Sequence, residues 1–520
     1  MNKILNALAL AGLAVGASGL QAAVFTGRGT PDGTLLGQTT ANAMAVNPDG
    51  VGHVLILPYF SVQNGNATVI TLSNADNLNG KAVKLRFRGA ANADNLMDLT
   101  LFLSPNDVWN GVVTQNAVTG LAQLSTDDAT CTLPVLAKGV STPFTTNRIN
   151  PGLNAADQAT QTREGYAEVI TLADIPVNLA VNSLSRAITH VNGVPGNCAS
   201  PAVQATLTDA ATEGVAAAMG FATPTTGLQG NWTLINVPQT LTFAGSATAL
   251  QAVDVNGLPA RANYVLFPQS SSPALAVDNL TADPLFRSNP AGSKTAAGVT
   301  TLYAPAVGGL PVVRAALYDF PDLSTPYLAG LSIPTQQTVA TSKALAVKSV
   351  SNDYSSDSAV SAATDWLFSL PTLRYSKGLD YRQATPTVVY SLAASAGNVE
   401  YFSDANSMGA SALPKAFYDR DGTLRRSAFC ATGCDAGFSL KGAVSLVTFS
   451  ANQASAVGGR VAMDSASSLA FTNGWGVVDT SNGGAGLPVL GTAFIRANNP
   501  AAAAGVSGNY GISSTHTVTR

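Results

Sequence analysis

Residues 53–89 alternate apolar segments with clusters of Asn, Gly and Asp. The segments HVLILPYFSV (53–62), NATVITLSN (66–74) and KAVKLRFRG (81–89) are separated by QNGN and ADNLNG. Stretches rich in β-branched and aromatic residues, bounded by turn residues, are typical of β-strands. Asn-Gly steps are typical of tight turns. We therefore expect a strand–turn–strand meander here.

Similar segments recur along the chain, at 99–105, 166–176, 231–237, 262–268, 365–375, 442–450 and 474–480. Helical patterns are fewer, and the clearest one, 209–220, has a glycine in its middle. This balance predicts an all-β fold: a large antiparallel β-sandwich, or two packed sandwiches, with short helical insertions. We treat 23–520 as one unit with a soft boundary within 193–230, which is rich in Pro, Gly, Ala and Thr.

Residues 1–22 have the pattern of a cleaved signal peptide. Lys3 is followed by an apolar run of 12 residues at 4–15 and by a small-residue stretch that ends in LQA at 20–22. A transmembrane helix needs about 20 apolar residues, so this run is too short to be one. We expect cleavage between Ala22 and Ala23, no transmembrane span, and a secreted, extracellular or cell-surface protein, with the periplasm as the alternative.

The chain has four cysteines: Cys131, Cys198, Cys430 and Cys434. An even number of cysteines in an exported protein predicts disulfides. Three connectivities are open, and nearness in sequence favours Cys131–Cys198 with Cys430–Cys434. A zinc site of four thiolates usually has two short C-x2-C pairs, and this chain has one short pair, with a three-residue spacing, so the metal alternative is weaker.

Charged residues make up only 11% of the chain, 27 Lys and Arg against 30 Asp and Glu. The average in soluble domains is about 25%. A sparsely charged, nearly neutral surface repels copies of itself weakly, so we expect self-association. Nucleic-acid binding requires a net basic domain, so we exclude nucleic acid as a partner.

The stretch KAVKLRFRG concentrates four cations: Lys81, Lys84, Arg86 and Arg88. The last three alternate with apolar residues at 83, 85 and 87, including Phe87. A period of two places the apolar residues on one face of a strand and the cations on the other. The sequence therefore predicts a half-buried strand whose cationic face lies in solvent.

Candidate catalytic residues are sparse. None of the familiar hydrolase, metalloprotease or nucleotide-binding motifs follows a suitable strand. The three histidines, His53, His190 and His516, show no triad pattern, although triad members need not be close in sequence. Glu164 and Glu168 would lie about 13 Å apart on one strand face, too far for a glycosidase pair. We expect no enzymatic activity.

Two Asx-rich segments and two tryptophans remain as candidates for binding. The segments 74–80 and 418–424 do not fit an EF-hand loop and are interpreted as turns. Calcium therefore stays an open alternative without a specific motif, and no other cofactor is expected. Trp109 and Trp366 are candidates either for core packing or for a ligand platform.

Segments spread over most of the chain carry a resemblance. They are residues 57–111, REGYAEVITLADIP (163–176), ATDWLFSLPTLRY (363–375), FYDRDG (417–422) and GLPVLGTAFIRANN (486–499). Together they resemble a family of exported proteobacterial cell-surface, surface-layer-like proteins. Gly89 stands where the family often has an acidic residue. The resemblance implies a surface location and brings no agreed catalytic residues with it.

These observations lead to one expected function and two alternatives. We expect an exported structural protein at the surface of a Gram-negative cell that associates with itself and has no catalytic activity. The first alternative is a secreted adhesin or glycan-binding protein, with an outer-surface glycan or lipid as partner. The second is a secreted hydrolase whose site is assembled from distant segments.

Overall fold

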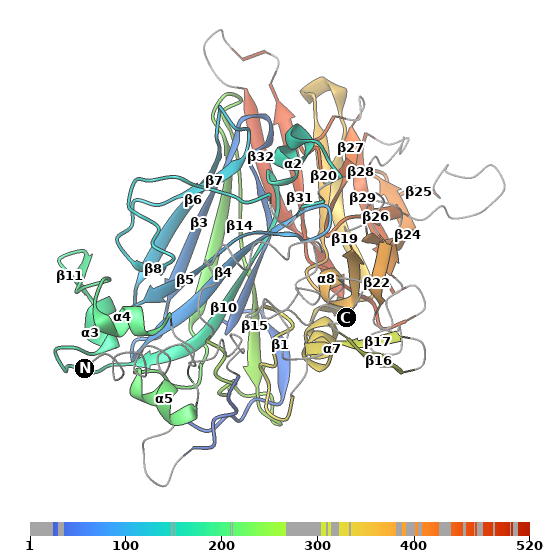
Figure 1. Cartoon of the computed structure of the whole chain (residues 1–520). Coiled ribbons are helices and arrows are strands. Elements are labelled where there is room, and N and C mark those ends of the chain that lie inside the picture. The colour runs from blue at the N-terminus through green and yellow to red at the C-terminus, as the bar shows by residue number, and fades with distance from the viewer. Residues whose placement is uncertain are drawn as a thin grey trace, which may run out of the picture.

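A computed structural model of the 520-residue chain describes residues 24–29, 36–146, 149–150, 152–207, 210, 212–266, 303–307, 310–313, 322–331, 334–380, 387–391, 401–403, 408–425, 438–450, 454–461, 463–464, 472–481, 484–499, 501–502 and 508–520. The strands form two halves that lie side by side, blue to green for the first and yellow to red for the second (Figure 1). Each half is built from two sheets whose strands pair antiparallel, apart from one short parallel pair in the second half, so the all-β prediction is confirmed.

The first half is a sandwich of a seven-stranded and a six-stranded sheet. The seven-stranded sheet contains, in spatial order, β1 (Ala43–Asn47), β15 (Thr248–Val253), β2 (Val54–Ser61), β10 (Glu164–Pro176), β4 (Asn79–Gly89), β5 (Asn95–Leu103) and β8 (Cys131–Leu133). The six-stranded sheet contains β14 (Leu241–Ser246), β13 (Leu228–Asn236), β3 (Asn66–Asn74), β6 (Val108–Gln115), β7 (Ala122–Ser125) and β9 (Thr142–Pro143). Apolar side chains of this half fill the space between the two sheets, with Phe60, Phe87 and Phe144 forming one aromatic cluster.

The expected meander at 53–89 is wrong in its pairing, although its strands and turns are present. β2 and β4 lie in the seven-stranded sheet, whereas β3, between them in sequence, lies in the other sheet. The turn at η1 (Gln63–Gly65) has Asn64 and Gly65 in left-handed conformations, as a tight reversal requires. Turn chemistry at this Asn-Gly step fixes where the chain reverses, but not whether the next strand pairs with the last one or crosses to the facing sheet.

The second half is also a two-sheet sandwich. One sheet contains β23 (Tyr401–Ser403), β24 (Met408–Asp419), β29 (Asn473–Asp479), β19 (Ser349–Ser355) and β33 (Thr517–Thr519), with β25 (Leu424–Arg425) and β26 (Phe438–Lys441) pairing on β24. The other contains β28 (Met463–Asp464), β27 (Val444–Ser450), β20 (Ala363–Ser369), β31 (Thr492–Asn498) and β32 (Asn509–Thr515). Trp366, Phe417 and Phe449 pack against one another in its core.

Short elements connect and cover the sheets. The helices are α2 (Ala155–Gln161), α3 (Leu184–Ile188), α4 (Pro201–Ala205), α5 (Glu213–Ala218), α7 (Pro334–Leu345), α8 (Leu373–Ser376) and the 3-10 turn η4 (Ser358–Val360). Small strand pairs are β11 (His190–Val191) with β12 (Val194–Pro195), β16 (Tyr303–Val307) with β17 (Leu310–Val313), β18 (Ala346–Val347) with β30 (Leu487–Pro488), and β21 (Lys377–Asp380) with β22 (Thr387–Ser391). None of the helices within the described ranges has the length and apolar character that crossing a bilayer requires.

The soft boundary expected within 193–230 does not coincide with the change between the two halves. Those residues supply β12, α4, α5 and the start of β13, all of which belong to the first half. β13 lies between β14 and β3 in the six-stranded sheet, so a boundary there would cut the sheet. The change from one pair of sheets to the other falls after β15.

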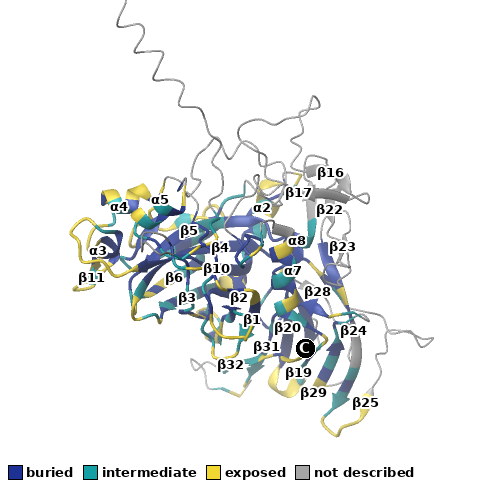
Figure 2. Cartoon of the chain, turned by 90° about the horizontal axis from the view of Figure 1, so that it is seen from below, coloured by how far each residue is buried: buried dark blue, intermediate teal, exposed yellow. Residues whose placement is uncertain are grey.

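The prediction that the cations of β4 face solvent is wrong. Lys81, Lys84, Arg86 and Arg88 are all buried, and Figure 2 shows dark blue along β4 and β10. The period of two is present, because Phe87 packs against Phe60 and Phe144 in the sandwich core. Residues distant in sequence cover the cations: Asp322 and Tyr375 contact Arg88, and Asp174 and Thr225 contact Lys81, so both faces of the strand are buried.

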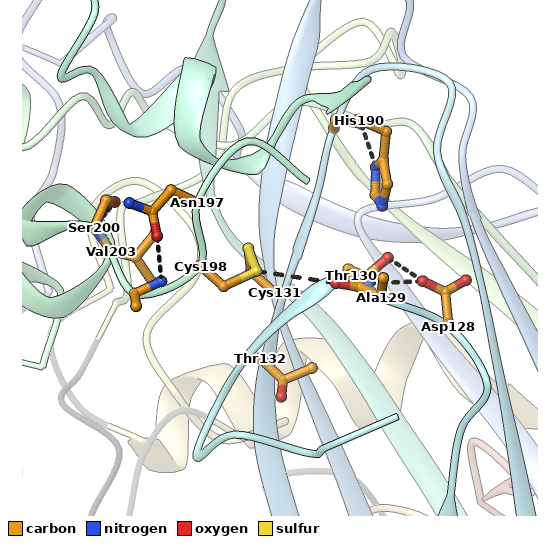
Figure 3. Close-up of a disulfide and its surroundings, with 12 residues drawn as sticks. Asp128, Ala129, Thr130, Cys131, Thr132, His190, Asn197, Cys198, Ser200 and Val203 are labelled. Carbon is orange, nitrogen blue, oxygen red and sulfur yellow. Dashed lines mark hydrogen bonds between the residues drawn. A yellow bond between two sulfur atoms is a disulfide. The ribbon is translucent and has the colours of Figure 1, made fainter. Parts of the chain in front are cut away.

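Cys131 and Cys198 are joined by a disulfide, as their nearness in sequence predicts (Figure 3). Their Cα atoms are 5.1 Å apart. The bond ties the edge strand β8 to the loop that precedes α4. Cys430 and Cys434 lie outside the described residues, as do Ala22 and Ala23 at the expected cleavage site.

We expect the Cys131–Cys198 bond to stabilise the fold substantially, because it closes a loop of 67 residues. Replacing both cysteines by serine should lower the free energy of unfolding by about 4 kcal/mol in the chain-entropy model. Denaturant unfolding of the purified protein with its disulfide intact, compared with the double serine variant, measures this. A loss below about 1 kcal/mol would contradict the prediction, because the unfolded chain would then gain little freedom when the loop opens.

Candidate functional site

A group of charged and phenolic side chains lies where the seven-stranded sheet meets the second half. This junction network, as we name it, consists of Arg88, Glu168, Tyr166, Tyr375 and Asp322, and all five are buried. Arg88 belongs to β4, Glu168 and Tyr166 to the neighbouring β10, and Tyr375 to α8. Arg88 and Tyr375 are 287 positions apart in sequence, so the network exists only when both halves are in place.

Arg88 contacts both carboxylates of the junction network. Its Nε lies 3.3 Å from Glu168 Oε1, and its Nη2 lies 3.5 Å from Asp322 Oδ2. Nη2 also donates to the hydroxyl oxygen of Tyr375 at 2.8 Å, and this hydroxyl donates to Glu168 Oε1 at 2.9 Å. The Tyr166 hydroxyl donates to the same Glu168 oxygen at 3.2 Å. Hydrogen bonds therefore join Arg88, Glu168, Tyr166 and Tyr375 to one another, and Asp322 is held to Arg88 by charge.

The electrostatics of the junction network follow from burial and pairing. Burial opposes the charge of Arg88, but the attraction of Glu168 and Asp322 outweighs it and raises the pKa of Arg88. Burial raises the pKa of Asp322 to about 6 against the opposing effect of Arg88. Burial also raises the pKa of Tyr375, so its hydroxyl keeps its proton and acts as a donor. The junction network is therefore a set of buried side chains that stabilise one another, and none of them is exposed to a substrate in solvent.

Further ion pairs flank the junction network. Lys84 Nζ lies 3.3 Å and Arg86 Nη2 lies 3.8 Å from the carboxylate of Asp98 on β5. Arg374 Nη1 lies 3.5 Å from Asp94. With the junction network this gives four cations against four carboxylates: Lys84, Arg86, Arg88 and Arg374 with Asp94, Asp98, Glu168 and Asp322. The balance explains how the chain tolerates so many buried charges.

Glu164, the other glutamate of β10, also binds the second half. Its two carboxylate oxygens accept hydrogen bonds from the backbone N–H groups of Arg460 at 2.7 Å and Val461 at 3.2 Å. In the same loop, the carbonyl oxygen of Val457 accepts from the Asn66 side chain at 2.8 Å. The two glutamates considered as a glycosidase pair therefore each hold a different segment of the second half.

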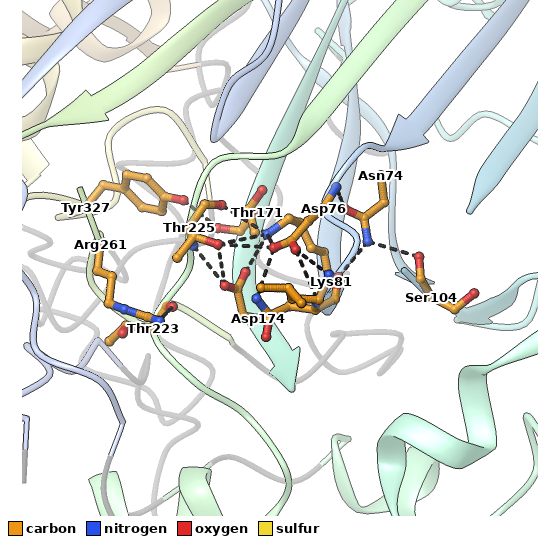
Figure 4. A network of polar contacts seen from close by, with 12 residues as sticks. Asn74, Asp76, Lys81, Ser104, Thr171, Asp174, Thr223, Thr225, Arg261 and Tyr327 are labelled. Carbon is orange, nitrogen blue, oxygen red and sulfur yellow. Dashed lines mark hydrogen bonds and ion pairs between the residues drawn. The ribbon is translucent and has the colours of Figure 1, made fainter. Parts of the chain in front are cut away.

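A second buried group, which we call the lysine cluster, lies at the opposite end of β4 and consists of Lys81, Asp76, Asp174 and Thr225 (Figure 4). Lys81 Nζ lies 2.7 Å from Asp174 Oδ1 and 3.1 Å from Asp76 Oδ2. It also donates to the carbonyl and hydroxyl oxygens of Thr225, each at 3.2 Å. Asp174 Oδ2 in turn accepts from the hydroxyl of Thr225 at 2.6 Å and from its backbone N–H at 3.1 Å.

The two carboxylates of the lysine cluster differ in character. Burial raises the pKa of Asp174, and this effect exceeds the lowering caused by Lys81 and Thr225. Asp76 is less buried. Burial acts against its charge, but hydrogen bonds from the Leu78 and Asn79 backbone and the charge of Lys81 lower its pKa to about 2. The pKa values of the two carboxylates therefore shift in opposite directions, upward for Asp174 and downward for Asp76.

The cluster of Ser104, Asp107 and His190 contains the residue types of a catalytic triad but not its arrangement. His190 Nδ1 lies 3.3 Å from Asp107 Oδ2 and 3.4 Å from Ser104 Oγ, and the serine hydroxyl also donates to the same Asp107 oxygen at 3.3 Å. A triad needs serine on one ring nitrogen and the carboxylate on the other, so that the imidazole can relay a proton. Here both contact one nitrogen, and this arrangement provides no relay.

The other two histidines are buried within the fold. His53 Nδ1 accepts from the Ala252 backbone N–H, and burial, together with the charge of Lys81, lowers the pKa of His53 to about 3. His516 Nε2 donates to the Leu367 carbonyl oxygen at 2.8 Å, and burial lowers the pKa of His516 to about 4. Both side chains therefore stay neutral in the folded protein at pH 7.

Trp109 and Trp366 are both fully buried, so neither forms a ligand platform on the surface. Trp366 Nε1 donates to the Asp353 carbonyl oxygen at 2.8 Å. The tryptophan that is exposed is Trp475 on β29, at 43%, and it stacks on Tyr418 with ring centroids 4.7 Å apart. The sequence did not single out Trp475, because exposure of an aromatic ring in a strand depends on which face remains uncovered.

The Asx-rich segments are used in turns and ion pairs. Asp419 Oδ1 accepts from the backbone N–H groups of Asp421 and Thr423. Asp76 Oδ1 accepts from those of Leu78 and Asn79, and its other oxygen contacts Lys81. Across the part of the chain that the structure describes, no three acidic, His or Cys side chains are grouped so that they could hold a metal ion.

An open surface depression of about 490 Å³ adjoins the lysine cluster. It is lined by Gln38, Thr40, Thr225, Thr226, Pro259, Ala260 and Arg261. Thr225 belongs to both the depression and the lysine cluster, so the buried Lys81 ammonium lies one side chain away from the surface. The depression is shallow and has no charged side chain other than Arg261 in its lining.

Comparisons of this chain with protein-family models, with curated proteins and with solved structures found no match.

Sequence reasoning missed most members of the two buried groups, namely Asp76, Tyr166, Asp174, Thr225, Asp322 and Tyr375. One signal was available: Glu168 and Asp174 lie inside an apolar strand of a chain that has few charges. A charge in such a position is rarely exposed without a partner. Pairing those acids with the cations of the neighbouring basic strand would have identified a buried network.

We predict that Arg88→Ala strongly destabilises the fold, because it leaves the buried Glu168 without its cation. Breaking a buried ion pair on one side costs about 3–5 kcal/mol. The matched control is Arg186→Ala at an exposed position of α3, where we expect a change within about 0.5 kcal/mol. Urea unfolding of both variants provides the measurement. If both changes lowered the free energy of unfolding equally, this would contradict the assignment of Arg88 to the buried junction network.

A second prediction concerns acid stability. Between pH 6.5 and about 4 an unfolded histidine binds a proton that folded His516 excludes, so stability falls as the pH falls through this range. From pH 7 to pH 5 this loss amounts to about 2 kcal/mol for one such histidine. In His516→Gln the amide can still donate to Leu367, and this part of the loss should vanish. Urea unfolding of both proteins at the two pH values tests this, and identical losses would show that His516 is protonated in the folded state.

Proposed function

We propose that this protein is an exported structural component of a cell surface that associates with copies of itself and has no catalytic activity. The observation that carries the proposal is the use of the buried charges. Arg88, Glu168 and Asp322 are buried and bind one another, and Arg88 and Glu168 also bind Tyr375 of the second half, so these charges face one another rather than solvent. Charged side chains that stabilise the fold in this way support a structural role more than a catalytic one.

The surface supports self-association. The chain has few charges to keep copies apart, and its net charge is only −3. Tyr510 and Ile512, at alternate positions of β32, are 60% and 55% exposed, so both side chains extend from the same face of this strand. Apolar side chains presented together in this way favour contact with another apolar surface, and a second copy of the chain supplies one.

A second candidate function is glycan binding, and the exposed Trp475–Tyr418 stack favours it. Aromatic faces bind the apolar faces of sugar rings, and Tyr and Trp combine an apolar ring with a polar tip. Asp353, paired with Trp475 across the strands and itself exposed, could supply a hydrogen-bond acceptor beside the rings. This reading keeps the surface location and replaces self-association by a ligand.

The two functions are separated by variants on different sheets. We predict that the double change of Tyr510 and Ile512 to Asp shifts the protein from oligomer to monomer, since buried apolar contacts would be replaced by facing charges. The free energy of unfolding should stay within about 0.5 kcal/mol of the wild-type value for each surface substitution. The control is Val118→Asp, at a 94% exposed apolar residue of a loop in the first half, which should leave assembly unchanged.

The measurement is sedimentation at rising protein concentration, combined with fractionation and imaging of the surface of producing cells. We expect ordered assemblies of the wild-type protein without added ligand. A wild-type protein that remains monomeric at all concentrations would overturn the proposal. Saturable glycan binding by that monomer, lost in Trp475→Ala, would establish the second candidate instead.

A further inference from the structure

The lysine cluster brings an amine and a carboxyl group into reacting distance inside the protein. Lys81 on β4 and Asp174 on β10 are directly opposite each other in the antiparallel ladder, and their side chains meet at 2.7 Å. Both are fully buried. Asp76 provides a third group, since its Oδ2 lies 3.1 Å from the same lysine nitrogen.

We propose that Lys81 and Asp174 condense into an intramolecular amide bond, with Asp76 as the proton carrier. This inference concerns a covalent modification of the chain and does not depend on the proposed function. It requires no cofactor, oxidant or energy source, because the two reacting groups and the proton carrier are all part of the folded chain.

The reaction balances within the cluster. One proton passes from the Lys81 ammonium to Asp174 Oδ1, which gives an amine and a carboxylic acid. The lysine nitrogen then forms a bond to Asp174 Cγ while Asp76 takes a second proton from it. Asp76 returns this proton to Oδ1, the Cγ–Oδ1 bond breaks, and one water leaves. The third ammonium proton remains on the amide nitrogen, and the two opposite charges are lost.

The surroundings of Asp174 favour this attack. Its Oδ2, where negative charge develops, accepts hydrogen bonds from the Thr225 hydroxyl at 2.6 Å and from the Thr225 backbone N–H at 3.1 Å. Two donors fixed on the oxygen of a tetrahedral intermediate are the arrangement that stabilises acyl transfer. The burial of Asp174 raises its pKa, which favours the protonated, electrophilic form. Holding the reacting atoms together replaces the high concentrations that amide formation otherwise needs.

The backbone at Gly227 fixes the position of the lysine. A Cβ at this residue would lie 2.7 Å from Lys81 Cε and 3.0 Å from Asp76 Cβ, and the φ of +151° is one that side chains rarely adopt. The absence of a side chain at Gly227 thus lets the backbone close over the lysine stem. Thr225 lies at the open surface depression, which gives the released water a short way out.

The alternative is a permanent ion pair, and the two states differ in mass. The experiment is intact mass spectrometry of the full-length secreted protein after reduction of its disulfides. We expect a mass that is one water molecule lower than the mass calculated for the chain from its measured N-terminus. Proteolysis should yield one branched peptide in which the segment around Lys81 is joined to the segment around Asp174. A wild-type protein of unmodified mass would overturn the proposal.

Variants assign the lost water to this site. Lys81→Arg keeps a cation but removes the amine, and Asp76→Asn keeps both partners but removes the proton carrier. Both should have the unmodified mass. A succinimide at an Asp-Gly step such as Asp421–Gly422 also releases water, but it would persist in Lys81→Arg and give no branched peptide, which would count against the amide bond. If Asp76→Asn retains the branched peptide, Asp76 is not the proton carrier.

The chain contains an internal control. Lys84 and Asp98 on β4 and β5 are also close, at 3.3 Å, but the Asp98 side chain is partly exposed, and its other oxygen accepts a hydrogen bond from Asn95 at 2.8 Å. Solvent that reaches a partly exposed carboxyl group opposes the loss of water that amide formation requires. We expect the peptides of this pair to remain separate. Cross-linking of both pairs would show that proximity alone suffices, and would contradict the roles assigned to Thr225 and Asp76.

Discussion

The burial of charge on β4 is the constraint on which the rest of the structure depends. Arg88 cannot remain buried in a protein interior unless carboxylates meet it there. Glu168 comes from the adjacent strand, but Asp322 and the Tyr375 hydroxyl belong to segments that follow the first sandwich in sequence. Arg88 is therefore fully partnered only when residues from beyond the first sandwich join Glu168 around it, and this makes the two parts of the chain depend on each other.

The same charges also specify how the strands align. Arg86 is opposite Glu168 on one side of β4 and Asp98 on the other, so a shift of either neighbour by one residue would place an apolar residue against the guanidinium. An apolar core alone tolerates such shifts better, because many apolar contacts are interchangeable. Only 11% of the residues in this protein are charged, and several of them lie on β4 and its neighbouring strands. There they favour one pairing register of these strands over shifted ones.

Local features of the fold were predictable from the sequence, and long-range ones were not. The strands around the basic stretch, the Asn64–Gly65 turn and the nearness of Cys131 to Cys198 follow from residue type and spacing. The burial of Arg88 does not follow from them. A period of two separates the two faces of a strand, but it does not indicate what covers each face. Here Tyr375, which is 287 residues away in sequence, contacts Arg88, and no local sequence pattern predicts such a contact.

The choice between lysine and arginine along β4 fits the role of each end. Arginine keeps its charge in any environment and binds several acceptors at once, which suits Arg88 between Glu168, Asp322 and Tyr375. Lysine loses its proton more readily when buried and has one nucleophilic nitrogen. Lys81 lies on the opposite side of the strand from Arg88, among oxygen atoms of Asp76, Asp174 and Thr225. An arginine at position 81 would form the ion pair but could not react. A lysine at position 88 would leave acceptors of the junction network without a donor. The two ends of one strand are thus built for different chemistry: one holds the halves together by charge, and the other places an amine beside a carboxyl group across two neighbouring strands.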